Sequence, residues 1–199
     1  SGLYKSFRIG QLLDLIVVDA RSQRTQEKEN VTAGAELPVD EHYAFGEVQR
    51  NWITNELKDS KTDGTKWRIV GSDDVFGQSP PQSIFNGRDF FGEDKLEGYD
   101  AERQIIIDTI VDNDIDNVVC LSGGPHTGIA QKVFSTGNPI QDDSDSYPVF
   151  TEFVLDAMSA PKLFEESRFL PYVNNYTQDW SWISPYFKLL VDGYCIVDI

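Results

Sequence analysis

Apolar and polar residues alternate along the first part of the chain with the two-residue period of half-buried β-strands. The alternation predicts one strand at residues 4–9 and a second at residues 12–19, with a turn at Gly10-Gln11 between them. Residues 22–38 then carry mixed charges and few large apolar side chains. Such a composition is typical of a surface segment, so the chain is expected to leave the core after its first strand pair.

Two longer segments carry apolar residues at helical spacing. Residues 40–58 predict one amphipathic helix and residues 97–112 a second. A short apolar run typical of a buried strand follows each of them, at residues 67–71 and 117–121. This alternation favours an α/β layer, in which functional loops lie at the carboxyl ends of strands. Residues 123–126 form such a loop.

The last part of the chain returns to strands. We expect them at residues 147–155, 185–191 and 193–199, with a hairpin turn at Asp192-Gly193 joining the last two. A chain of 199 residues with 40% hydrophobic content can bury the core of one domain. The pattern therefore predicts a single domain over residues 1–199, of α/β class with an α+β tendency: a mixed sheet with flanking helices and a terminal antiparallel hairpin.

The charge of the chain restricts its partners. Thirty-three acidic and 17 basic residues give a formal net charge of −16. This charge repels nucleic acid and anionic lipid surfaces, whereas it attracts calcium and basic protein surfaces. No apolar run reaches the length of about 18 residues that suggests a spanning helix, so membrane insertion is not expected. Because the chain enters a strand soon after Ser1, we also expect an upstream segment to have been removed.

Cysteines and glycosylation patterns bear on the compartment. Cys120 and Cys195 lie in apolar strand-like runs, which favours two buried thiols, although a disulfide between neighbouring strands stays an alternative. Asn30 and Asn175 each begin an Asn-x-Thr acceptor pattern. These patterns have meaning only in a secreted chain, and an extracellular location is the expectation adopted here.

The chain has two histidines, in different settings. His42 lies in the first predicted helix, where a surface or capping role is favoured. His126 follows a buried strand and a Gly-Gly-Pro turn, where α/β folds usually bind ligands, and a purely structural role is an equal alternative. Residues 112–117 place acidic groups at positions 1, 3 and 5 of a calcium loop but lack its glycine at 6 and glutamate at 12, so a helix-to-strand turn is favoured.

Several short motifs occur in the order of a known family. Asp19-Ala20-Arg21 resembles an Asp-x-Arg strand end, and residues 49–53 resemble a Gln-x-x-Trp-Leu helix. Further matches lie at residues 6–10, 66–70, 97–103, 151–161 and 193–198. Together they resemble the PhoD-like alkaline phosphatases and phosphodiesterases, which are metal-dependent hydrolases. The resemblance implies the C-terminal half of a metallophosphatase-like sandwich.

The departures from this family concern its metal site. The family loop reads Gly-Asp-x-His where this chain has Gly123-Gly124-Pro125-His126, so the carboxylate is replaced by hydrogen at Gly124. Leu96-Glu97 stands in place of Trp-Asp, and residues 170–173 stand where the family commonly has Asn-Pro-His. The upstream half with the remaining ligands has no counterpart before Ser1. The resemblance thus implies an eroded site.

Site residues are carried over from the resemblance. It implies His126 and Asp19 as metal ligands and His126 and Arg21 as catalytic residues, with calcium and iron as cofactors if another chain completes the site. Arg21 and Arg24 are suited to clamp a phosphate, and a surface ion pair is the equal alternative.

Two functions follow from these expectations. The first is a pseudoenzyme: a degenerate, secreted glycoprotein that binds or assembles with other protein subunits. The second is the C-terminal chain of a two-chain metal-dependent phosphodiesterase or alkaline phosphatase, completed by an N-terminal fragment.

Overall fold

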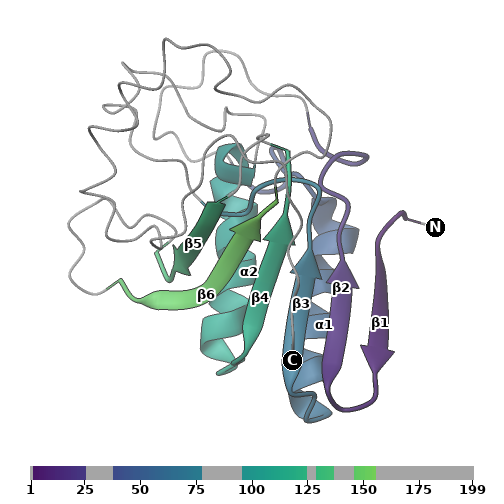
Figure 1. The fold of residues 1–199 in the computed structure, drawn as a ribbon. Helices are drawn as coiled ribbons and strands as arrows, with labels where there is room; N and C mark the ends of the chain where they lie inside the picture. The colour runs from purple at the N-terminus through teal and green to yellow at the C-terminus, as the bar shows by residue number, and fades with distance from the viewer. Residues whose placement is uncertain (1, 26–37, 78–95, 125–128, 137–145, 156–199) are drawn as a thin grey trace.

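The computed structural model describes residues 2–25, 38–77, 96–124, 129–136 and 146–155. These residues form one six-stranded mixed sheet with two α-helices (Figure 1). In chain order the elements are β1 (Lys5–Ile9), β2 (Leu13–Val17), α1 (Gly46–Thr62), β3 (Trp67–Gly71), the 3-10 helix η2 (Leu96–Tyr99), α2 (Asp100–Asp112), β4 (Val118–Ser122), β5 (Ile129–Phe134) and β6 (Pro148–Val154).

The sheet has the strand order β1-β2-β3-β4-β6-β5. Its four central strands are parallel, whereas β1 and β5 pair antiparallel with their neighbours at the two edges. Parallel strands joined by helices are typical of α/β folds, so the predicted α/β class is confirmed. The parallel order also brings the carboxyl ends of β2, β3 and β4 to one edge of the sheet.

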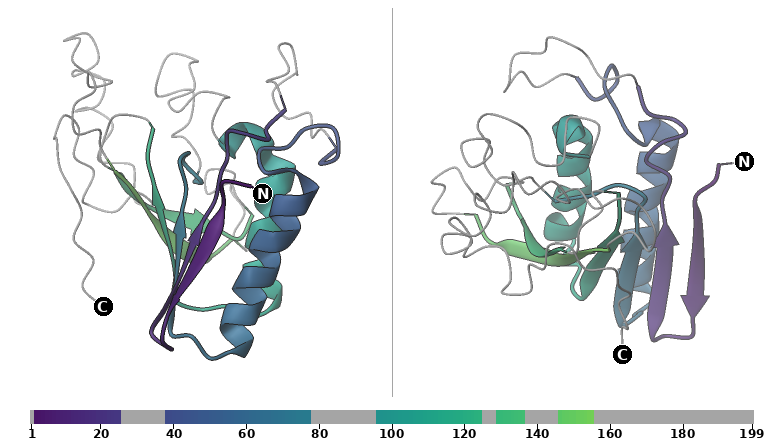
Figure 2. Two further views of the ribbon diagram at one scale, coloured as in Figure 1. Left: turned by 90° about the vertical axis from the view of Figure 1, so that its right-hand side faces the viewer. Right: turned by 45° about the horizontal axis from the view of Figure 1, so that its top comes forward.

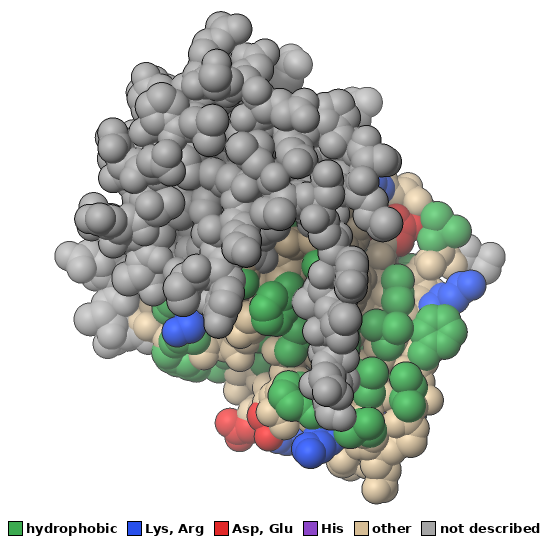
Figure 3. Space-filling model, in the orientation of Figure 1, with side chains coloured by type: hydrophobic (Ala, Val, Ile, Leu, Met, Phe, Trp, Pro, Cys, Tyr) green, Lys and Arg blue, Asp and Glu red, His purple; other side chains and the backbone are tan. Residues whose placement is uncertain are grey.

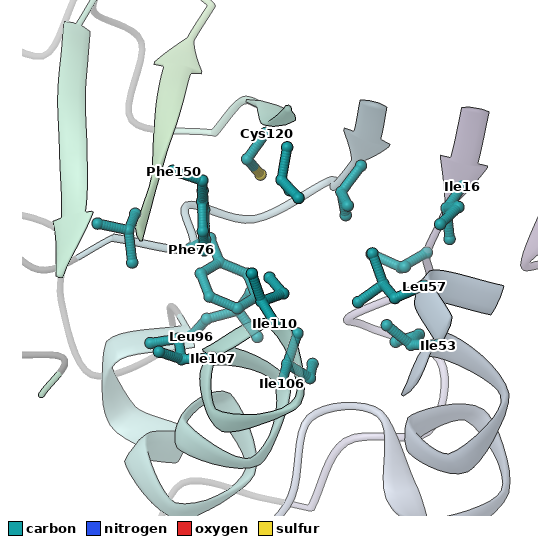
Figure 4. Packing of buried hydrophobic residues seen from close by; sticks show 14 of the residues in the cluster. Ile16, Ile53, Leu57, Phe76, Leu96, Ile106, Ile107, Ile110, Cys120 and Phe150 are labelled. Atoms are coloured by element: carbon teal, nitrogen blue, oxygen red, sulfur yellow. The ribbon is translucent and has the colours of Figure 1, made fainter. Parts of the chain in front are cut away.

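Both α-helices lie against the same face of the sheet (Figure 2). The core between them and the sheet is built from aliphatic and aromatic side chains (Figure 4). Ile16 of β2 and Leu57 of α1 are fully buried, as is Ile107 of α2. Cys120 of β4 is 1% exposed and is a free thiol, which agrees with the prediction of a buried cysteine. No helix among the described residues is long and apolar enough to cross a membrane.

The first helix differs from its prediction at both ends. It begins at Gly46 instead of residue 40, and it continues to Thr62. The start is displaced because the backbone N–H groups of Ala44 and Phe45 donate to the buried carboxylate of Glu102, at 2.7 and 2.8 Å. Gly46 then takes a φ of 72°, a conformation that favours glycine. The second predicted helix is also divided, because its first turn is the 3-10 helix η2.

The amino edge of the sheet is closed by one buried guanidinium. Arg68, 1% exposed, donates to the backbone oxygens of Ser60, Thr65 and Asp116. These oxygens belong to the end of α1, the turn before β3 and the turn before β4. In that last turn Asp114 and Asn117 have positive φ values of 50° and 51°, so the acidic run at residues 112–117 is the predicted helix-to-strand turn.

Candidate site at the carboxyl edge of the sheet

Three strand ends meet at the carboxyl edge of the parallel strands. Val18 donates a backbone hydrogen bond to Gly71 at 2.9 Å, and Ser72 donates one to Leu121 at 2.9 Å. The segments that leave β2, β3 and β4 therefore start side by side (Figure 1). This edge is the place where an α/β fold usually holds its ligands.

Asp19 lies at the end of β2 as part of a tight turn. Its Oδ1 accepts hydrogen bonds from the backbone N–H groups of Arg21 and Ser22, at 3.1 and 2.9 Å. Burial opposes its ionisation, but the hydrogen bonds from Ser22 and Arg21 outweigh burial and lower the pKa of Asp19 below its ordinary value. The carboxylate thus holds the turn that presents Arg21.

Gln49 fixes the same turn from the helix side. Its Nε2 donates to the backbone oxygen of Asp19 at 2.9 Å, while its Oε1 accepts from the backbone N–H of Asp19 at 2.8 Å. Gln49 is 1% exposed, so the pair is shielded from water. The glutamine of the Gln-x-x-Trp segment therefore positions the end of β2.

The two arginines of this edge are paired with acidic residues that follow β3. The Nη2 atom of Arg21 lies 2.8 Å from Oδ1 of Asp74, and its Nε lies 3.5 Å from Oδ2 of Asp73. The Nη1 atom of Arg24 lies 3.4 Å from Oδ2 of Asp74. Both arginines are therefore ion-paired, but their shared partner Asp74 is only 1% exposed, so the pairing is not the surface ion pair that the sequence suggested, and a phosphate clamp stays a prediction.

A buried carboxylate that the sequence matched to the family, within residues 151–161, but did not assign to the site lies in the adjoining part of the sheet. Glu152 of β6 is fully buried and accepts hydrogen bonds from the backbone N–H groups of Phe76 and Gly77, both at 2.7 Å. Its oxygens also accept from the hydroxyl of Ser122 at 2.5 Å and the side-chain amide of Gln131 at 2.6 Å. One charged residue within an apolar strand was the available signal. Glu152 joins the segment after β3 to the end of β4 and to the middle of β5.

The loop after β4 starts at Gly123 and Gly124. Gly124 has a φ of 111°, in the region that side-chain-bearing residues rarely adopt. His126, the predicted metal ligand and catalytic residue, lies outside the described residues. Its placement relative to Asp19 and Arg21 therefore stays a prediction.

The residues that the structure describes do not fit a metal centre by themselves. They contain no group of three or more His, Cys, Asp or Glu side chains placed to hold an ion. Asp19 stabilises its own turn and Asp74 faces two arginines. Calcium and iron prefer several oxygen or imidazole ligands, which this set of side chains does not supply.

The second histidine has a structural setting. His42 precedes α1, and its ring stacks on Tyr99 with the centroids 4.4 Å apart. Its Nε2 lies 3.0 Å from the backbone oxygen of Gly98, and its Nδ1 lies 3.2 Å from Oγ1 of Thr25. These contacts join the segment before α1 to η2. Four other predicted features, Asn30, Asn175, Cys195 and the terminal hairpin, lie outside the described residues.

Three comparisons with known proteins agree. A family model described as PhoD-like phosphatase matches residues 1–199. Alkaline phosphatase D of Bacillus subtilis strain 168 is 28% identical over 144 residues, which cover 66% of this chain and 22% of that protein. A solved structure described as "Structure of PhoD" matches with a TM-score of 0.61 and 24% identity, covering 78% of this chain and 29% of the other.

The fraction of each relative that the chain covers limits what these similarities show about the chain. The chain spans less than a third of the length of either relative. At 24% identity the solved structure establishes the fold, and it agrees with the predicted metallophosphatase-like architecture. The family model, in contrast, matches the chain from its first residue to its last. The chain therefore belongs to the PhoD-like phosphatase family.

Proposed function

We propose that this PhoD-like chain does not hydrolyse phosphate esters by itself and acts as a secreted binding or assembly module, a pseudoenzyme within a larger complex. The observation that carries the proposal is Gly124, at the position where the family resemblance puts a metal-binding aspartate. Glycine supplies no anionic oxygen, so the charge that would hold a multivalent cation is reduced at this loop.

The backbone of Gly124 supports the same conclusion. At a φ of 111° an aspartate would be strained, so restoring the carboxylate requires the loop to change conformation as well. The difference from the family therefore involves the backbone conformation at position 124 as well as the missing side chain. A single substitution to aspartate is not expected to rebuild the site.

The face of the sheet away from the helices supports the assembly role. Phe7 and Ile9 of β1 are 53% and 55% exposed, and they pair with Leu15 and Leu13 of β2. Directly opposed residues of an antiparallel pair share a face, whereas the neighbouring Ile16 points toward the helices. Hydrophobic side chains gather over β1 and β2 in Figure 3. An apolar layer of another chain, either an N-terminal fragment or a further subunit, fits this surface.

The alternative is the C-terminal chain of a two-chain metal-dependent phosphodiesterase or alkaline phosphatase. It is favoured by the match of the family model to the whole chain and by the place of Asp19 and Arg21 at the carboxyl edge. In that enzyme an N-terminal fragment supplies the missing ligands for calcium and iron. Native material would then contain a second fragment and stoichiometric metal.

The first prediction separates these functions by activity. Purified chain with added calcium and iron is expected to hydrolyse bis-p-nitrophenyl phosphate no faster than its His126→Ala variant, because the loop lacks its carboxylate. Gly124→Asp is expected to remain equally inactive. Hydrolysis by the natural sequence that disappears in His126→Ala would overturn the proposal. Mass spectrometry and elemental analysis of native material test the two-chain alternative directly.

The second prediction concerns the apolar surface. In native complexes, Phe7→Glu is expected to weaken association at least tenfold, since it places a charge where apolar area is buried. Val48→Glu is the matched control, because Val48 is 76% exposed on α1, the helix side of the sheet. Size-exclusion chromatography with light scattering measures both. Equal association of Phe7→Glu and the natural sequence would exclude this face as the assembly surface.

A further inference from the structure

The pairing of two arginines with two acidic residues has a consequence for the ligands of this edge. Arg21 is 44% exposed at its side chain, so the surrounding protein does not shield it from a dissolved anion. Both oxygens of Asp74 face guanidinium groups, Oδ1 that of Arg21 and Oδ2 that of Arg24. A phosphate bridging two arginines would use its oxygens in the same way.

We propose that Asp73 and Asp74 form a carboxylate latch, which occupies Arg21 and Arg24 and excludes oxyanions such as phosphate from the carboxyl edge of the sheet. The inference rests on the proposed non-hydrolytic function and deepens it. It identifies Asp73 and Asp74 as the residues that determine whether the carboxyl edge of the sheet binds anions. The site beneath the latch is an oxyanion site in latent form.

The latch is held in place by the backbone on both sides. Oδ1 of Asp73 accepts a hydrogen bond from the N–H of Ala20 at 2.9 Å, which joins the segment after β3 to that after β2. The hydroxyl of Ser72 donates to the backbone oxygen of Asp74 at 2.7 Å and accepts from its N–H at 3.2 Å. The two carboxylates therefore need little reorganisation to meet the arginines.

Burial distinguishes the latch from an ordinary surface ion pair. Exposed pairs contribute little and open readily, because water and salt screen them. The side chain of Asp74 is only 1% exposed, so its charge stays in contact with the guanidinium groups. Among these described residues, the two acids offset the charges of the two arginines, and Asp19 adds a further negative charge. These charges give a phosphate dianion no net attraction, and the carboxylates beside the guanidinium groups repel it.

The experiment removes one carboxylate and measures phosphate binding. Asp73→Asn keeps the shape of a side chain that is 40% exposed. Inorganic phosphate is titrated calorimetrically at constant ionic strength, with chloride as the reference anion. We expect Asp73→Asn to bind phosphate about tenfold more tightly than the natural sequence, because one repulsive charge is lost. The Asp73→Asn/Asp74→Asn double variant is expected to gain more.

Two controls locate the effect. Asp63→Asn removes the same charge from an acid that pairs with Arg8 at the opposite, amino edge of the sheet, and it is expected to leave phosphate affinity unchanged. Adding Arg21→Met to Asp73→Asn is expected to abolish the gain. Circular dichroism verifies that each variant is folded.

Several outcomes overturn the latch. The natural sequence binding phosphate as tightly as Asp73→Asn, or Asp63→Asn gaining as much as Asp73→Asn, would show that these carboxylates do not control the edge. The comparison of Asp73→Asn with the natural sequence and with Asp63→Asn decides the result, so the test does not depend on whether the double variant folds. The assay reports binding only, so hydrolysis by the natural sequence would defeat the proposed function without altering this measurement.

Discussion

Replacing Glu152 by alanine is expected to lower the free energy of unfolding by about 3–5 kcal/mol. The fully buried carboxylate accepts hydrogen bonds from the backbone N–H groups of Phe76 and Gly77 and from the side chains of Ser122, Gln131 and Cys120. Alanine leaves these donors without an acceptor and also leaves a cavity, and each effect costs free energy. Urea unfolding followed by circular dichroism measures the loss.

Matched variants separate the carboxylate from the volume of the side chain. Glu152→Gln preserves the shape but turns an amide NH2 toward groups that are themselves donors, so we expect an intermediate loss of about 2 kcal/mol. Glu47→Ala removes an exposed glutamate from the first turn of α1 and is expected to cost less than about 1 kcal/mol. A Glu152→Ala variant as stable as Glu47→Ala would show that the carboxylate does not hold these segments together.

Much of the fold could be predicted because the hydrophobic patterns that specify its strands and helices lie within short segments of the sequence. The alternation at residues 4–9 and 12–19 predicted β1 and β2, and apolar runs predicted β3 and β4. The first helix was predicted six residues early, since its start depends on Glu102, which is 58 positions from Ala44 along the chain. A cap supplied from so far away leaves no periodic signal near the helix itself.

The strand β5 shows why a polar residue can conceal a strand. Ile129–Phe134 was not predicted, because Gln131 and Lys132 interrupt its apolar positions. In the sheet Gln131 is the register partner of Glu152 and donates to it at 2.6 Å. Each residue alone is unsuited to a buried strand, but as a pair they satisfy each other's hydrogen-bonding groups. Only the paired structure reveals this.

The candidate site was predictable in part for the same reason. Asp19 and Arg21 stand at a recognisable strand end, and the ion-pair alternative for Arg21 and Arg24 could be stated from charge alone. Their partners Asp73 and Asp74 lie in the segment after β3, where the hydrophobic pattern predicted neither a helix nor a strand. Because loop conformation is set by tertiary contacts such as Ala20 to Asp73, sequence reasoning could not pair them.

Replacing Gly77 by alanine is expected to destabilise the protein by about 2–3 kcal/mol, because the segment after β3 has no room for a methyl group. A Cβ atom at this position would lie 2.3 Å from Nε2 of Gln131 and 2.8 Å from Oε2 of Glu152. Gly71→Ala is the control, since its Cβ would meet nothing closer than Val17 Cγ2 at 3.8 Å. Thermal and urea unfolding measure both variants.

The crowding at Gly77 identifies which neighbour must yield. Gln131→Ala removes the closest atoms, and alone it is expected to cost about 1 kcal/mol by releasing one hydrogen bond to Glu152. In the Gly77→Ala/Gln131→Ala double variant the two closest contacts disappear and only the contact with Oε2 of Glu152 remains, so the two losses should combine to less than their sum. Strict additivity would mean that the alanine is accommodated by movement of the backbone, and that Glu152 does not fix the segment that carries Asp73 and Asp74.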